Sequence, residues 1–149
     1  MPDELLRPTI GADVDLSARP WRLTSQAYVA FFGGVIATTL IAFLNARRLG
    51  VAASKRRLIL ALGGAGLVAE AIVLVLLTDD LTATSGVRVA IRVVAVATCL
   101  AQVRIQQPMD RAFQLRNADY GSLWSPGIAA VIGCGFLEIV LLAIVAVWL

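Results

Sequence analysis

Three charged residues, Glu70, Arg92 and Glu138, lie within stretches that are otherwise apolar enough to cross a lipid bilayer. A charge in hydrocarbon costs roughly 2.5 to 3.5 kcal/mol on insertion scales, so such residues usually face a partner, a cavity or a transport path. A carboxyl group in that setting can join an ion pair, donate a hydrogen bond when neutral, or carry a proton. These three residues are therefore the first candidates for chemistry in the chain.

The elements that hold these residues follow from composition and hydropathy. With 149 residues, 59% hydrophobic and 15% charged, the chain is too apolar for a soluble domain. Stretches of about 20 apolar residues match a bilayer core of about 30 Å. The sequence predicts an all-α integral membrane bundle of four transmembrane helices at about residues 25–44, 58–77, 87–103 and 127–149. Together they form one domain, residues 23–149, behind a polar N-terminal tail, residues 1–22.

The loops predict the orientation and one further element. Basic residues gather in two loops: Arg47, Arg48, Lys55, Arg56 and Arg57 in the first, and Arg104, Arg111 and Arg116 in the other. The positive-inside rule makes both loops cytoplasmic, so both termini are expected outside the inner membrane. Between the third and fourth spans, Pro108, Met109, Ala112 and Phe113 have the spacing of a short amphipathic helix lying in the interface.

Helical spacing predicts which faces of the spans pack. Gly63, Gly66 and Glu70 fall at i, i+3 and i+7, so the glycines and the carboxylate share one face. Gly135 stands one turn before Glu138, and Gly33 with Gly34 gives the first span a similar face. Small residues let helices approach closely in lipid. A polar stripe on the third span consists of Arg88, Arg92, Ala95, Cys99, Gln102 and Gln106, and it should face the bundle or a subunit interface.

Depth predicts an ion pair. Glu70 and Arg92 both lie roughly 8 to 10 Å from the outer ends of neighbouring spans. Glu138 lies near the bilayer midplane without an evident partner. Three roles remain open for it: a neutral acid that donates a hydrogen bond between helices, a second partner of the arginines, or a carboxylate of proton- or cation-coupled transport.

Enzymatic functions lack the residues they need. The chain has no histidine, which excludes Ser-His and Cys-His nucleophiles, His-ligated haem and the usual zinc sites. Cys99 and Cys134 are single and are expected as reduced packing residues. We expect no enzyme activity, no metal, no cofactor and no nucleic-acid partner.

A resemblance comes from short motifs. Leu23-Thr24-Ser25-Gln26, Phe32-Gly33-Gly34, Asn45, Arg48-Leu49-Gly50 and Tyr120-Gly121-Ser122-Leu123 make the chain similar to small four-span bacterial membrane proteins of unknown function. The resemblance implies the four-span layout and no activity.

Two hypotheses for function follow. The first is a noncatalytic structural or accessory subunit of the bacterial inner membrane that packs through Gly and Ala faces. Its partners would be the lipid bilayer and either a second copy or another membrane protein. The alternative is a small proton- or cation-coupled transporter or channel centred on Glu138.

Overall fold

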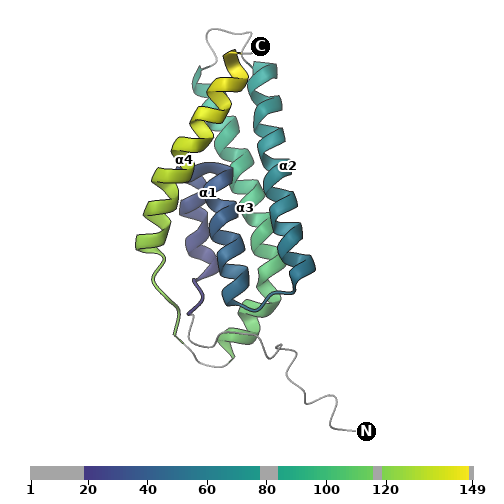
Figure 1. The fold of residues 1–149 in the computed structure, drawn as a ribbon, viewed down its shortest axis with the longest axis vertical. Helices are drawn as coiled ribbons and strands as arrows, with labels where there is room; N and C mark the ends of the chain where they lie inside the picture. Colours follow the sequence, from purple (N-terminus) through teal and green to yellow (C-terminus); the bar gives the residue numbers. More distant parts are fainter. Residues whose placement is uncertain (1–18, 78–83, 116–118, 148–149) are drawn as a thin grey trace.

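The computed structural model describes residues 19–77, 84–115 and 119–147, and these form an all-helical bundle (Figure 1). The elements are a short 3-10 helix, η1 (Leu23–Ser25), and the α-helices α1 (Gln26–Arg48), α2 (Ala53–Leu77), α3 (Thr84–Gln114) and α4 (Trp124–Val147). Counted along the sequence, and for α1 across a break at Gly34, all four α-helices are long and apolar enough to cross a membrane, so the predicted helical membrane architecture is confirmed at this level. The polar tail predicted at residues 1–22 lies mostly outside the described residues.

Three of the helices reach the upper end of the bundle. In Figure 1, α2 and α4 begin in the lower half and rise to the upper end, and α3 runs back from there. Their apolar stretches contain the second and third predicted spans and the fourth as far as Val147, the last described residue. Much of their surface is exposed, with Ile132 and Phe136 of α4 at 68% and 70%, as expected for helices whose outer faces meet lipid.

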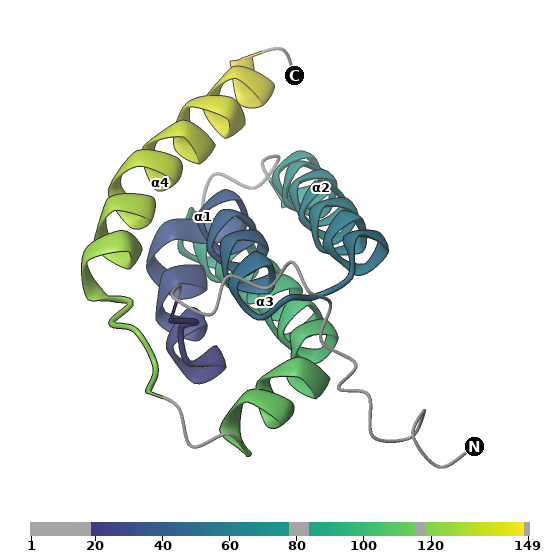
Figure 2. The ribbon, with the colours of Figure 1, turned by 60° about the horizontal axis from the view of Figure 1, so that its bottom comes forward.

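The first helix folds back on itself. The backbone N–H of Trp21 donates to Asn45 Oδ1 at 2.7 Å. A continuous helix would separate these two residues by about 36 Å. Arg48 also reaches Arg19, donating to its carbonyl oxygen at 3.0 Å. Both ends of α1 therefore lie at the lower end of the bundle, and Figure 2 shows the two parts side by side.

The turn of this hairpin lies at Gly34. Its backbone has φ 77° and ψ −164°, a non-helical conformation that residues with a side chain rarely adopt. We call residues 26–33 the first limb and residues 35–48 the second limb. At 1.5 Å per residue they extend about 12 and 21 Å, so neither limb alone crosses a bilayer core of about 30 Å. The expectation of a straight crossing at residues 25–44 is therefore corrected.

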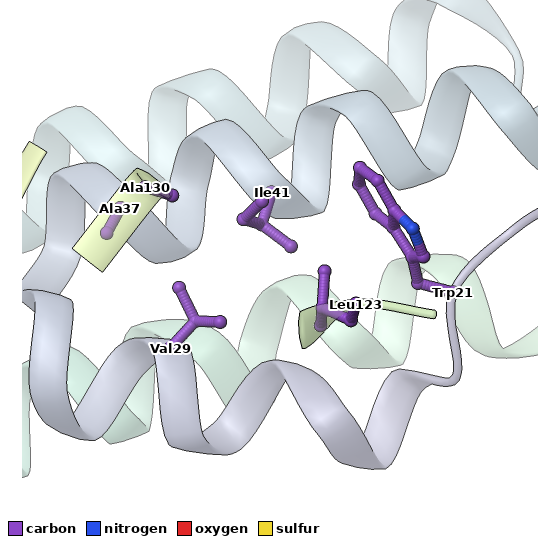
Figure 3. Close-up of a cluster of buried hydrophobic side chains, with 6 residues drawn as sticks. All are labelled: Trp21, Val29, Ala37, Ile41, Leu123 and Ala130. Atoms are coloured by element: carbon purple, nitrogen blue, oxygen red, sulfur yellow. The ribbon is translucent and has the colours of Figure 1, made fainter. Parts of the chain in front are cut away.

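Apolar side chains fill the hairpin. Val29 of the first limb packs with Ala37 and Ile41 of the second limb (Figure 3). Leu123, just before α4, and Ala130 of α4 close the same cluster. A second cluster around Ala42, Ala46 and Ile59 joins the second limb to α2. The hairpin is thus the centre of the bundle, and α4, α3 and α2 pack around it.

The predicted interfacial helix is not a separate element. α3 continues through Pro108 to Gln114, although proline supplies no backbone N–H and usually kinks a helix. Its last turns lie beyond the apolar stretch, where Asp110 is buried and accepts hydrogen bonds from Tyr120 at 2.9 Å and Gln114 at 3.0 Å. These contacts tie the end of α3 to the segment before α4.

The described chain begins and ends at opposite ends of the bundle. Gly121, just before α4, donates its backbone N–H to the carbonyl oxygen of Pro20 at 2.9 Å. The chain then runs through α4 to Val147, about 36 Å away for 24 helical residues. The hairpin is the cause, because it returns the chain to the end from which it started.

Candidate functional site

The Glu138 carboxylate caps the second limb of the hairpin. Ile36, near the start of that limb, donates its backbone N–H to Glu138 Oε2 at 2.8 Å, and Val35 adds a further backbone interaction. The first N–H groups of a helix lack partners within the helix and carry partial positive charge. Glu138 is 4% exposed, and it satisfies these donors from a different helix. None of the three predicted roles described this one.

Gly34 makes this cap sterically possible. A Cβ atom at position 34 would collide with the Glu138 carboxyl group. Gly33 and Gly135 lie beside it at the crossing of the first limb and α4: a Cβ on Gly135 would lie 3.5 Å from Gly33 Cα. The double glycine thus permits both the turn and the close approach of the acid.

Glu70 is the buried charge without a hydrogen-bond partner. Its side chain is fully buried, and within the described part of the chain neither carboxyl oxygen accepts a hydrogen bond. Gly63 and Gly66 share its helix face: a Cβ on Gly63 would collide with Thr39, and one on Gly66 would press on Thr98. Glu70 therefore faces the interior, one turn beyond the contacts that hold α2 against the second limb and α3.

Arg92 interacts with both carboxylates through space. Its charge acts on Glu70 and on Glu138, and Glu138 in turn acts on Glu70. No hydrogen bond joins Glu70 to Arg92 among the described residues, so the predicted ion pair rests on their electrostatic interaction alone. Glu70 and Arg92 were predicted at the same depth in the membrane. Glu138 of α4 lies close to them as well. The three charges form one cluster at the tip of the hairpin.

The polar stripe of α3 holds the hairpin below this cluster. Gln102 is buried and donates from Nε2 to Thr39 Oγ1 at 2.9 Å and to the carbonyl oxygen of Ile59 at 3.1 Å. Gln106 accepts from Asn45 Nδ2 at 3.1 Å and donates to Gln26 Oε1 at 3.4 Å. The stripe therefore joins both limbs and α2 by hydrogen bonds in an apolar setting, where such bonds replace water.

The remaining members of the stripe lie on either side of these glutamines. Cys99 is buried and its thiol forms no disulfide. The same holds for the thiol of Cys134 in α4, which is half-buried. Ala95 is buried and Arg88 is exposed near the start of α3. In the described ranges, no three His, Cys, Asp or Glu side chains lie close enough to hold a metal ion.

Gln26, Thr39 and Asn45 line the inside of the hairpin, and the sequence pattern predicted no contact for them. Gln26 and Asn45 stand at the two ends of the first apolar stretch, 19 positions apart. That placement resembles two membrane boundaries. Their common contact with Gln106 shows instead that both stand at one level of the bundle.

A second polar group lies at the lower end of the bundle. Arg48 lies over the Trp21 ring, 3.9 Å from its centroid, and Arg22 over the Tyr120 ring at 5.5 Å. Burial raises the pKa of the Tyr120 phenol. These contacts fasten the segment before η1 to the hairpin and to the loop before α4.

No protein family, curated protein or solved structure matches this chain.

Proposed function

We propose that this protein conducts protons across a bacterial inner membrane, with Glu70 as the group that exchanges the proton. The observation that carries the proposal is a fully buried carboxyl group without a hydrogen-bond partner beside a second carboxylate and an arginine. Buried polar groups are normally satisfied, and intramembrane carboxyl groups that are not mark proton and ion pathways.

The hairpin supports the same function. Irregular backbone at membrane depth occurs where it is buried in protein or lines a cavity, and broken helices form the ion and substrate sites of transporters. Here the turn at Gly34 brings the start of the second limb to Glu138, and Glu138 lies within electrostatic range of Glu70. Glu138 thus fixes the hairpin, whereas Glu70 is the carboxyl group with no such structural bond.

The accessory-subunit hypothesis requires glycine faces that are free to bind a partner, but in the bundle other helices of the same chain cover these faces. Gly63 meets Thr39, Gly66 meets Thr98, and Gly33 meets Val131 within the same bundle. A partner helix therefore has no access to these faces. This occupancy favours proton conduction over docking.

The hairpin also changes the proposed orientation. Because it returns to its own side, Arg19 and Arg22 join the basic residues of the two loops at one end of the bundle. By the positive-inside rule that end is cytoplasmic. We therefore place the N-terminal segment in the cytoplasm and the end of α4 outside.

Proton flux into liposomes tests the function. Purified protein is reconstituted with a pH-sensitive dye inside the vesicles, and a potassium gradient with valinomycin drives proton entry. We expect flux above that of empty vesicles for the unaltered protein and a return to the empty-vesicle rate for Glu70→Gln, which keeps the size of the side chain.

Asp119→Asn is the matched control, because Asp119 is an exposed carboxylate in the loop before α4. It should conduct like the unaltered protein. Sodium flux measured in the same vesicles, and potassium flux measured in vesicles without valinomycin, distinguish protons from other cations. Equal proton flux for the unaltered protein and Glu70→Gln would reject the proposal, as would no flux above empty vesicles.

A further inference from the structure

A long apolar groove runs along α3 on the side that faces the first limb. It encloses about 480 Å³ and is lined by Phe31 of the first limb and by Val89, Val93, Val96, Ala97 and Leu100 of α3, together with Arg88 and Arg92. Its surface is almost entirely apolar, so the arginines contribute their aliphatic stems. Phe31, Val89, Val93 and Leu100 are more than half exposed.

The groove has the length and polarity of one leaflet. Arg88 to Leu100 is twelve residues of helix, about 18 Å, against about 15 Å for half of a bilayer core. Arg88 stands at the upper end of the bundle, near the start of α3, and is exposed. Leu100 lies toward the middle of the same helix. A charged end at the boundary and an apolar channel toward the midplane match a lipid with one headgroup and an acyl chain.

Charge selects the headgroup. No acidic side chain lines the groove in the part of α1 and α3 that the structure describes. Arginine near a membrane boundary extends its guanidinium to the headgroup level and binds phosphate in bidentate geometry. Arg92, one turn deeper, adds positive charge on the same face. A zwitterionic headgroup would place its own ammonium group near the two arginines, which repel it. An anionic headgroup carries no such cation and is therefore preferred.

We propose that this groove binds one anionic phospholipid of the membrane, with an acyl chain along Val89, Val93 and Leu100 and the phosphate on Arg88. The short hairpin creates the site, because a first helix that crossed the whole bilayer would not end beside the middle of α3. The proposal does not depend on proton conduction, because it is carried by Arg88 and the apolar residues of α3, which are not part of the charged cluster; Arg92 belongs to both.

Native mass spectrometry of the protein in detergent with added lipid tests this inference. At equal mole fractions, we expect one phosphatidylglycerol molecule to be retained in preference to phosphatidylcholine. Arg88→Gln should weaken phosphatidylglycerol binding about fivefold, the effect of one basic residue near a membrane surface, and Arg88→Lys should restore most of it. Val93→Trp should abolish retention of either lipid by filling the groove.

Arg104→Gln is the control, because Arg104 is also exposed on α3 but does not line the groove. Circular dichroism and size-exclusion profiles establish that each variant is folded. Equal retention of the two lipids by the unaltered protein would overturn the inference. An effect of Arg104→Gln as large as that of Arg88→Gln would also overturn it, because it would indicate general charge attraction and not a site.

Discussion

At the scale of single residues, the two membrane glutamates differ in what surrounds them. Glu138 accepts backbone N–H groups at the start of the second limb, whereas Glu70 has no hydrogen-bond partner among the described residues. Charge-assisted hydrogen bonds to backbone donors are worth roughly 1.5 to 3 kcal/mol, and leaving buried donors without an acceptor costs a similar amount. Glu138 is therefore a structural residue first.

Gly34→Ala tests the link between the turn and the carboxylate. This backbone conformation alone should cost about 1 to 3 kcal/mol for a residue with a Cβ, and the new methyl group would displace Glu138 from Ile36. We expect a lower unfolding temperature in detergent, measured by circular dichroism.

Gly64→Ala is the matched control for that measurement, because a Cβ at Gly64 of α2 meets nothing within 4 Å. In a helix interior this exchange usually stabilises by roughly 0.5 to 1 kcal/mol. The two alanine variants should therefore shift the unfolding temperature in opposite directions. Equal shifts would contradict the role assigned to the turn.

At the scale of elements, hydropathy and spacing predicted α2, α3 and α4 because their apolar faces and their ends follow local rules. Gln102 and Gln106 were expected to face inward, and in the structure they bond to Thr39 and Asn45. The break in α1 could not be read in this way. Residues on both sides of Gly34 are apolar, and hydropathy does not record whether a chain continues or turns back.

The cause of that break lies far away in the sequence. Glu138 caps the second limb from a position 102 residues beyond Ile36. Gly33 and Gly34 were predicted to let helices pack closely; Gly33 lies against Val131 of α4, whereas Gly34 also makes the turn beside Glu138. The predicted pairing of Glu70 with Arg92 stays a prediction, and it considered only two of the three helices that bring charge to the tip.

Electron spin distances test the hairpin directly. Thr24 and Arg47 are exposed, so each can carry a spin label without entering the core. A continuous helix would place their backbones about 35 Å apart. The hairpin predicts a distance far below that value, because Trp21 bonds to Asn45. A distribution centred near 35 Å in lipid vesicles would show a crossing helix instead.

At the scale of the whole molecule, the short hairpin leaves the two halves of the bundle different. The lower half holds both limbs with α2, α3 and the start of α4, tied by glutamines and asparagine. Above Gly34 only α2, α3 and α4 continue. The charged cluster lies at this transition. If the protein conducts protons as we propose, a proton from the upper end would meet Glu70 where the bundle becomes densely packed.

The orientation provides the test at this scale. With a straight first helix the chain would cross four times, and both termini would lie outside the cell. In the arrangement we propose, only α2, α3 and α4 cross the membrane, so we expect the N-terminus in the cytoplasm and the C-terminus outside. Alkaline phosphatase, which is active only outside the inner membrane, should be active when fused after Leu149 and inactive when fused before Met1. A fluorescent protein that folds only in the cytoplasm should give the reverse pattern. Phosphatase activity at both ends would restore the four-crossing arrangement and remove the hairpin from the membrane-embedded fold.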